Sequence, residues 1–225
     1  MAARPTILKR PSPNYGPRRH ALRPILIVLH YTAMETSEAA LDRLIDPKAE
    51  VSAHYLICED GIVYQMVDET MRAWHAGAGS WQGMGDINSR SIGIELCNRG
   101  DHPFAESQMA ALCSLLPAIM TRWSIFPSGV IARSVVVPTR KIDPGPKFDW
   151  QRLAIQGLTV WPDEESGYDT DLQCWTQHAA AIGYDMAEPD AVLAAFRARF
   201  RPWAKGPLDD EDVRRSERLN KSCMI

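Results

Sequence analysis

Four side chains of this sequence could together perform hydrolytic chemistry: His30, Glu95, Lys141 and Asp143. A histidine and an aspartate can bind zinc, a glutamate can take a proton from water, and a lysine can stabilise a developing oxyanion. Lys141 and Asp143 precede the Pro-Gly-Pro turn at 144–146, whose fixed proline φ angles should hold both side chains in a defined geometry. A lone glutamate in a strand can equally be an ordinary edge carboxylate in water, so the residue types alone leave the roles open.

Predicted strands should position the first two of these residues. The apolar run 25–29 ends at His30 and is typical of a strand buried on both faces. Residues 91–96 form a second apolar segment that contains Glu95, and residues 129–132 predict a short strand that leads into the loop 139–148. A histidine at the end of a buried strand is well placed for chemistry.

The remaining pattern predicts an α/β fold. A helix should begin at Thr36 or Ser37 and end before Pro47, and Asp60-Gly61 predicts a hairpin between 53–58 and 62–67. A helix is expected over 105–123, where Pro117 should kink or break it. The order of these elements predicts a mixed central sheet flanked by helices. The Gly-, Ser-, Asn- and Trp-rich loop 73–90 is long enough to predict a binding surface.

The chain divides by composition into four parts. Residues 1–23 form a basic, Pro-rich leader, residues 24–157 the α/β domain, and residues 158–168 a linker. Residues 169–225 form a small C-terminal module of three predicted helices at 172–182, 189–200 and 209–219. About 60 residues are marginal as an independent fold, so the module should lean on the α/β domain.

Charge and hydropathy narrow the choice of partners. The net charge is −3, which argues against a protein that binds nucleic acid by neutralising phosphates. No segment approaches the roughly 20 apolar residues of a membrane span, and no signal-peptide pattern follows Met1, so a cytoplasmic location is expected. The oligomeric state is left open.

Five short motifs in a fixed order carry a family resemblance: 29–33 (LHYTA), 52–55 (SAHY), 74–77 (WHAG), 92–96 (IGIEL) and 138–146 (PTRKIDPGP). As a set they resemble the type 2 N-acetylmuramoyl-L-alanine amidases, zinc enzymes that include the AmpD and AmiD amidases and are related to peptidoglycan recognition proteins. The resemblance spans about residues 20–155.

The resemblance implies a bacterial, zinc-dependent hydrolase of peptidoglycan fragments (muropeptides). Its substrate bond is the amide between N-acetylmuramic acid and L-alanine, in cell-wall recycling or turnover. His30 and Asp143 then match zinc ligands, and Glu95 and Lys141 match the catalytic residues. Trp74, His75 and Asn88 match the substrate-lining region, where hydrogen-bonded core support is the alternative for His75 and for His54.

Arg133 departs from the family pattern, which places a second histidine ligand ten residues before the aspartate. A guanidinium has no lone pair for zinc, and only His102 and Cys97 are nearby candidates for a third ligand. The alternative function is therefore a metal-poor, catalytically impaired homologue that binds or senses muropeptides, with Arg133 facing Asp143 or a substrate carboxylate. The C-terminal module resembles three-helix peptidoglycan-binding domains, and a purely stabilising helical cap is the alternative.

Overall fold

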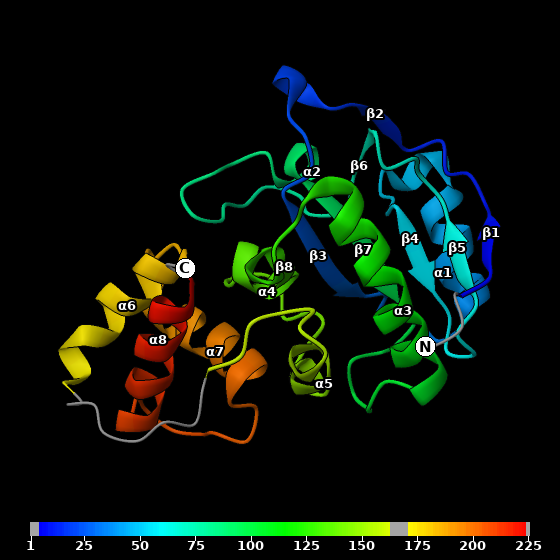
Figure 1. Cartoon of the computed structure of the whole chain (residues 1–225). Helices are drawn as coiled ribbons and strands as arrows, with labels where there is room; N and C mark the ends of the chain where they lie inside the picture. The colour runs from blue at the N-terminus through cyan, green and yellow to red at the C-terminus, as the bar shows by residue number, and fades with distance from the viewer. Residues whose placement is uncertain (1–4, 163–170, 224–225) are drawn as a thin grey trace.

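A six-stranded sheet forms the centre of the computed structural model, which describes residues 5–162 and 171–223 (Figure 1). From one edge to the other, the strands are β1 (Ile7–Lys9), β5 (Val63–Gln65), β4 (Tyr55–Ile57), β7 (Ser91–Leu96), β3 (Leu26–Tyr31) and β8 (Val130–Ala132). The β4–β5 pair is antiparallel and the other neighbours are parallel. The predicted mixed sheet is confirmed, including the buried strand that ends near His30 and the hairpin around Asp60-Gly61.

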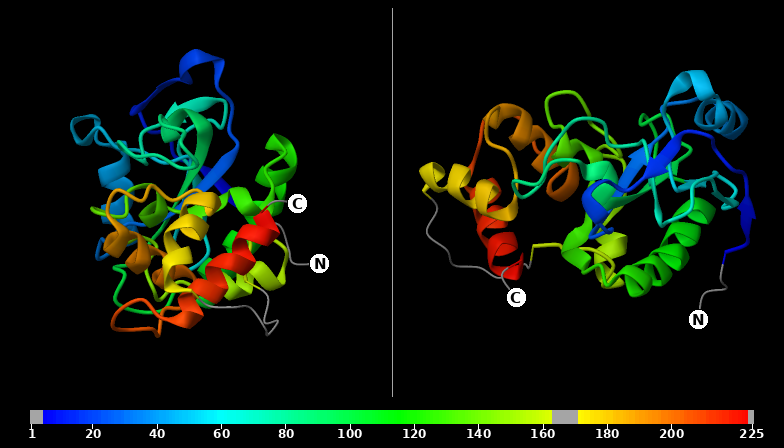
Figure 2. Two further views of the ribbon diagram at one scale, coloured as in Figure 1. Left: turned by 90° about the vertical axis from the view of Figure 1, so that its left-hand side faces the viewer. Right: turned by 90° about the horizontal axis from the view of Figure 1, so that it is seen from above.

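Helices cover both faces of the sheet. Helix α1 (Ser37–Ile45) lies on one face and helix α3 (Glu106–Trp123) on the other, as the view from above shows (Figure 2). Successive residues of β4 point to opposite faces: Leu56 packs in the cluster with α1, and Ile57 packs in the main core with α3. The side chain of Thr36 caps α1 by accepting a hydrogen bond from the amide of Ala39, at 3.1 Å.

Helix α3 runs unbroken through Pro117, so of the two predicted effects, a kink or a break, the break is wrong. Pro117 lies on the exposed side of the helix, whereas Leu112, Leu116 and Ile119 are fully buried. On that side, water can hydrogen-bond the carbonyl that the proline leaves without a donor, which makes the proline tolerable there.

Two segments of the N-terminal leader join sheets. Strand β1 adds a parallel edge to the central sheet, and β2 (Tyr15–Pro17) pairs antiparallel with β6 (Met71–Ala73). Three-residue strands with exposed side chains leave no hydrophobic pattern, so the sequence did not predict them. Arg18 anchors the leader by donating hydrogen bonds to the carbonyls of Glu69, Ser89 and Ser91, at 2.8, 2.9 and 3.1 Å.

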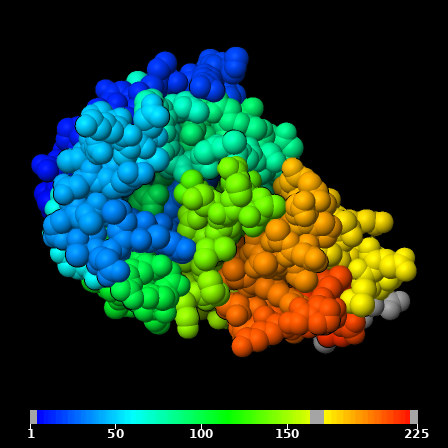
Figure 3. Space-filling model, turned by 180° about the vertical axis from the view of Figure 1, so that it is seen from behind, coloured from blue at the N-terminus to red at the C-terminus, as the bar shows by residue number. Residues whose placement is uncertain are grey.

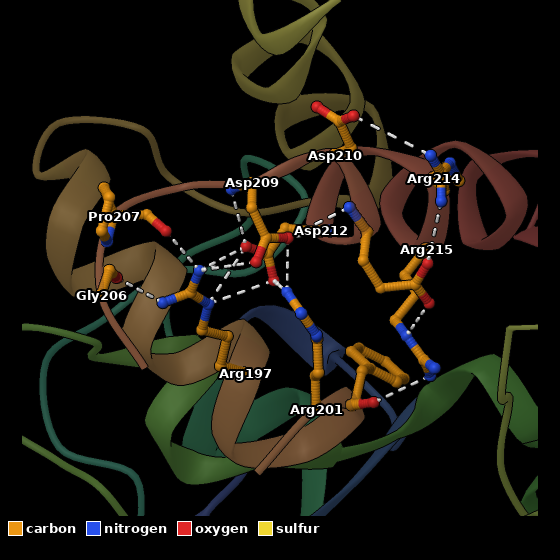
Figure 4. Close-up of polar contacts among 11 residues, drawn as sticks. Arg197, Arg201, Gly206, Pro207, Asp209, Asp210, Asp212, Arg214 and Arg215 are labelled. Atoms are coloured by element: carbon orange, nitrogen blue, oxygen red, sulfur yellow. Dashed lines mark hydrogen bonds and ion pairs between the residues drawn. The ribbon is translucent and has the colours of Figure 1, made fainter. Parts of the chain in front are cut away.

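Three helices form the C-terminal part and lie beside the α/β domain (Figures 1 and 2). They are α6 (Trp175–Ile182), α7 (Pro189–Phe200) and α8 (Asp210–Cys223), close to the predicted bounds. A buried ion pair joins α7 to α8, in which Nη2 of Arg197 lies 2.5 Å from Oδ2 of Asp212 (Figure 4). The predicted linker 158–168 falls in part on residues 163–170, outside the described residues.

Shorter helices complete the fold. They are α2 (Ile87–Arg90), α4 (Arg133–Val136) and α5 (Trp150–Ile155), with single 3₁₀ turns at Arg19–Ala21, Pro47–Ala49, Pro127–Gly129 and Leu172–Cys174. Within the described ranges, none of the helices is both long enough and apolar enough to cross a bilayer.

Candidate active site

Neighbouring parallel strands place His30 and Glu95 side by side. His30 is the fifth residue of β3 and Glu95 the fifth of β7, and the two are partners in the strand register. Their side chains therefore leave the same face of the sheet, with Nδ1 of His30 3.8 Å from Oε1 of Glu95. Both lie near the carboxyl ends of the parallel strands, the edge at which α/β folds commonly build their sites.

The loop after α4 brings Asp143 to the same place. Oδ2 of Asp143 lies 3.1 Å from Nδ1 of His30. The loop is held by backbone hydrogen bonds, from the amide of Ser134 to the carbonyl of Asp143 and from the amide of Lys141 to the carbonyl of Val137, each 3.0 Å long. Lys141 lies on the wall of the cavity beside Asp143. The structure thus brings together all four side chains that the sequence singled out for chemistry.

His75 lies behind His30 in a buried hydrogen-bond chain. Its Nδ1 is 3.0 Å from Nε2 of His30, and its Nε2 is 3.1 Å from Oγ of Ser91. The ring of His75 lies directly over Gly93 on β7, where any Cβ would collide with it. Oδ1 of Asn88 accepts hydrogen bonds from the amides of His75 and Ala76, at 3.1 and 2.8 Å. Asn88 therefore holds the backbone that carries His75.

This chain defines which nitrogen of His30 is free. The hydroxyl of Ser91 donates its one proton to the carbonyl of Ile87, at 2.6 Å, so it can only accept from Nε2–H of His75. Burial lowers the pKa of His75 and of His30, so both rings are neutral near pH 7. Nδ1 of His75 then accepts from Nε2–H of His30, and Nδ1 of His30 turns a lone pair toward Asp143. This arrangement is that of two ligands facing a common cation.

Glu95 has a free oxygen in this cluster. No described residue hydrogen-bonds its buried Oε2. Burial raises the pKa of Glu95 to about 8, the negative charge of Asp143 adds to the rise, and the charges of Arg133 and Lys141 oppose it. A carboxyl group with such a pKa exchanges protons readily near neutral pH, as a general acid or base must.

A cavity of about 910 Å³ opens above these side chains. The space-filling view shows the molecule hollowed between the blue-to-cyan segments and the yellow-green segment near residue 140 (Figure 3). Trp74, His75 and Asn88 contribute to its wall, although the latter two are nearly buried. Basic side chains on the wall outnumber acidic ones; the basic set is Arg19, Arg43, Arg72, Arg133, Arg140 and Lys141, and the acidic set is Glu50, Asp86, Glu95 and Asp143.

The donor set does not fit a three-ligand zinc site. His30 and Asp143 fill two places, but Arg133, at the start of α4, offers no lone pair for the third. His102 is exposed and bonded to Asp101, and Cys97 lies in the apolar cluster under α1, so neither can complete the set. In the part of the chain that the structure describes, no group of three or more His, Cys, Asp or Glu side chains could hold a metal ion.

Sequence reasoning did not assign Ser91 and Gly93 to the site, although the orientation of His30 and His75 depends on them. Both lie in the predicted strand that carries Glu95, Ser91 four residues and Gly93 two residues before it, so strand alternation places them on the same face as that carboxylate. A glycine on this face was the available signal, because glycine in a strand commonly marks a close approach by another group. The approaching group comes from the loop 73–90, and no local pattern reveals that.

Sequence comparison gives a family and several relatives. The family model described as "N-acetylmuramoyl-L-alanine amidase" matches residues 20–146. The N-acetylmuramoyl-L-alanine amidase AmiD of Escherichia coli is 36% identical over 210 residues, which cover 79% of this chain and 75% of that protein. The 1,6-anhydro-N-acetylmuramyl-L-alanine amidase AmpD of Citrobacter freundii is 36% identical over 160 residues, which cover 64% of this chain and 86% of that protein.

Solved structures of similar shape include complexes with muropeptides. The complex of E. coli AmiD with anhydro-N-acetylmuramic acid-L-Ala-D-γ-Glu-L-Lys has a TM-score of 0.81 at 34% identity, covering 95% of this chain and 93% of that one. AmpDh3 of Pseudomonas aeruginosa in complex with anhydromuramic pentapeptide has a TM-score of 0.80 at 29% identity, covering 95% and 96%. The coverage includes the C-terminal helices as well as the α/β domain.

Proposed function

This chain belongs to the N-acetylmuramoyl-L-alanine amidase family, and from that premise we propose that its cavity binds a muropeptide and cleaves the amide between N-acetylmuramic acid and L-alanine. The observation that carries the proposal is the carboxyl of Glu95 on the wall of a large cavity: its Oε1 lies 3.8 Å from Nδ1 of His30, and its buried Oε2 has no hydrogen-bond partner among the described residues. Similar proteins are solved with anhydro-muropeptides bound, which supports a ligand of this class.

In the proposed reaction, Glu95 is the group that moves protons. Its free Oε2 takes a proton from the attacking water and passes it to the leaving amine of L-alanine. Lys141 lies on the same wall and supplies positive charge where the carbonyl oxygen becomes an oxyanion. His30, Asp143 and the His75 chain form the fixed base of the site. The family's zinc would polarise the same carbonyl, but the third ligand place holds Arg133, so these roles rest on the chain's own side chains.

The substrate would lie along the cationic wall. Trp74 offers an aromatic face for the sugar or the stem peptide, and we assign His75 and Asn88 to the shape of the wall rather than to direct contact because both are nearly buried. A free carboxylate on the stem peptide suits a wall on which basic groups predominate. The muramoyl amide is a secondary amide like the peptide bonds of the stem, so contacts with the sugar would have to position the scissile bond.

Product analysis tests this proposal. The purified chain is incubated with anhydro-N-acetylmuramic acid-L-Ala-D-γ-Glu-L-Lys, and the released tripeptide and anhydro sugar are measured by mass spectrometry. We expect both products in equal amounts. Glu95→Gln keeps the size of the side chain but removes the proton acceptor, so it should lower the rate about 100- to 10,000-fold. A Glu95→Gln variant that turns over like the parent protein would contradict the assigned role.

Muropeptide binding without turnover is a second candidate, and Arg133 favours it. The arginine stands where the resemblance places a zinc ligand, and two donors alone make a weak metal site. Calorimetric titration with the same ligand separates the two functions: binding without product supports a receptor, whereas binding with product supports an amidase. If neither binding nor product is found, both functions are wrong.

A further inference from the structure

Arg133 is a cation on the cavity wall that has no acidic partner in the part of the chain that the structure describes. Among residues 5–162 and 171–223, no carboxylate oxygen lies within ion-pair distance of its guanidinium, and its buried Nε has no hydrogen-bond acceptor. The pairing with Asp143 that the sequence suggested is therefore not formed. Two other arginines of the wall are engaged: Arg72 pairs with Asp86 at 3.2 Å, and Arg140 donates to the carbonyl of Ala78 at 2.8 Å.

The guanidinium has a defined place. It lies toward Gly77, where a Cβ would be 3.9 Å from Nη2 of Arg133, so the glycine leaves open space in front of the charge. The amide of Ser134 donates to the carbonyl of Asp143, which ties the start of α4 to the loop that carries Lys141. The positive charge of Arg133 reaches His30, His75 and Glu95, all of whose proton affinities it lowers. The charge of Arg133 thus acts on the same side chains that a bound metal ion would affect.

An unpaired guanidinium in a cavity is suited to one kind of ligand group. Its N–H donors match the two oxygens of a carboxylate in a bidentate geometry, which gives a stronger contact than a neutral acceptor. Leaving such a group partly buried without a partner costs free energy, which a bound carboxylate would offset. Lys141, which lines the same cavity, adds a second positive charge.

We propose that Arg133 is a carboxylate receptor that supplies the positive charge of this site in place of a metal ion, so that the chain binds its muropeptide without zinc. The inference rests on the proposed muropeptide ligand and names the residue that anchors it. Two carboxylates have the right chemistry, one on the ligand and one on its product. The first is the α-carboxylate that a γ-linked D-glutamate leaves free, and the second is the lactyl carboxylate of N-acetylmuramic acid, which is free only after the amide is cleaved.

Calorimetric titrations with and without EDTA test the metal independence. The ligand is N-acetylmuramoyl-L-Ala-D-γ-Glu-L-Lys amide, whose one free carboxylate is the α-carboxylate of the glutamate. Its integrity is checked by mass spectrometry after each titration; if it is cleaved, all proteins are compared in the Glu95→Gln background. We expect the parent protein to bind equally well with EDTA. Stoichiometric zinc in the purified protein, or binding that EDTA abolishes, would overturn the inference while leaving the proposed function intact. Failure to bind under any condition would instead overturn the proposed function.

Substitutions at Arg133 test the carboxylate contact. Arg133→Met keeps most of the length of the side chain but removes its charge, so it should weaken binding at least tenfold. The affinity of Arg133→Lys should fall between those of the parent protein and Arg133→Met. Circular dichroism and thermal unfolding identify any variant that fails to fold. If Arg133→Met fails to fold, the affinity of Arg133→Lys still tests the contact. Equal affinity of the parent protein and a folded Arg133→Met variant would refute the contact.

Titrations with two further ligands identify which carboxylate Arg133 binds. If the D-glutamyl carboxylate is the partner, its α-amide should bind the parent protein more weakly and should be insensitive to Arg133→Met. If the lactyl carboxylate is the partner, free N-acetylmuramic acid should bind and should show the Arg133→Met loss. An Arg133→Met loss that is equally large with the α-amide, together with no binding of N-acetylmuramic acid, would exclude both carboxylates and refute the receptor role.

Arg133→His gives the converse test with zinc chloride alone as the probe. The lone pair of His30 and the carboxylate of Asp143 already face one point, so a histidine at 133 should complete a three-ligand site. We expect zinc affinity at least 100-fold above that of the parent protein. Arg10→His, the same change at an exposed arginine of the N-terminal leader, is the matched control and should leave zinc affinity unchanged. No gain in the folded Arg133→His variant would show that position 133 is not the vacant ligand place and would overturn the inference.

Discussion

Lys141 shows how one side chain can be assigned a role from its surroundings. It follows the short helix α4, its amide is fixed to the carbonyl of Val137, and its charge acts on both His30 and Glu95. The ammonium group thus lies near the atoms at which negative charge would develop. Because the backbone of Lys141 is held, little free energy is needed to position its charge in the transition state.

We therefore expect Lys141→Met to lower kcat about 100- to 1,000-fold, with a smaller change in KM, since the oxyanion forms only in the transition state. Steady-state kinetics on the anhydro-muropeptide measures both parameters. Lys147→Met, an exposed lysine on the same loop, is the control. A change confined to KM would assign Lys141 to ground-state binding instead.

At the scale of elements, Glu69 fastens helix α3 to the sheet. Nε and Nη2 of Arg122 donate to its carboxylate at 2.9 and 2.7 Å, and Nε1 of Trp123 donates at 2.7 Å. From β4, the hydroxyl of Tyr55 donates at 2.7 Å. Burial by itself would raise the pKa of Glu69, but these hydrogen bonds outweigh it and lower the pKa. The ionised form is therefore the one that stabilises the fold.

The consequence is a pH-dependent stability. The contribution of Glu69 is fully present above its ordinary pKa of 4.5 and is lost as the pH falls through the lowered pKa of the folded chain. Glu69→Gln should cost about 2 kcal/mol of unfolding free energy at pH 7, and the difference from the parent protein should shrink toward pH 3. Urea unfolding across this range measures it. Glu188→Gln, at an exposed carboxylate, is the control; a difference that stays constant with pH would count against the ionised contact.

At the scale of the whole molecule, Arg199 joins the C-terminal helices to the α/β domain. From α7, its Nη2 donates to the carbonyl of Val130 at 3.2 Å and to Oγ1 of Thr159 at 2.8 Å. Its guanidinium also lies 4.4 Å from the ring centre of Trp150. The side chain is almost fully buried between the two parts. These contacts should make the two parts unfold together.

Thermal unfolding tests this coupling. We expect a single transition for the parent protein, and Arg199→Met should lower the stability by about 2 to 4 kcal/mol because buried polar partners lose their donor. The matched control, Arg214→Met, removes a partly exposed arginine from α8 and should leave the midpoint nearly unchanged. Two separate transitions in the parent protein would show that the helices fold independently of the α/β domain.

The local pattern of the sequence was sufficient for most of the central architecture. Continuous apolar runs predicted β3 and β7, Asp60-Gly61 predicted the hairpin, and capping and proline signals gave α1 and α7 nearly to the residue. These features succeed because burial and turn chemistry act over a few neighbouring residues. Pro117 misled the prediction because its effect depends on which side of α3 meets water.

What the sequence by itself determined is the set of reactive residue types, their motif order and the substitution at Arg133. Only the tertiary structure decided how they meet: the strand register sets His30 beside Glu95, and Gly93 admits His75, which orients His30. Only the structure showed Arg133 without an acidic partner among the described residues. The physical reason is that register, ring orientation and ion pairing arise from contacts between segments tens of residues apart, whose geometry no local pattern encodes.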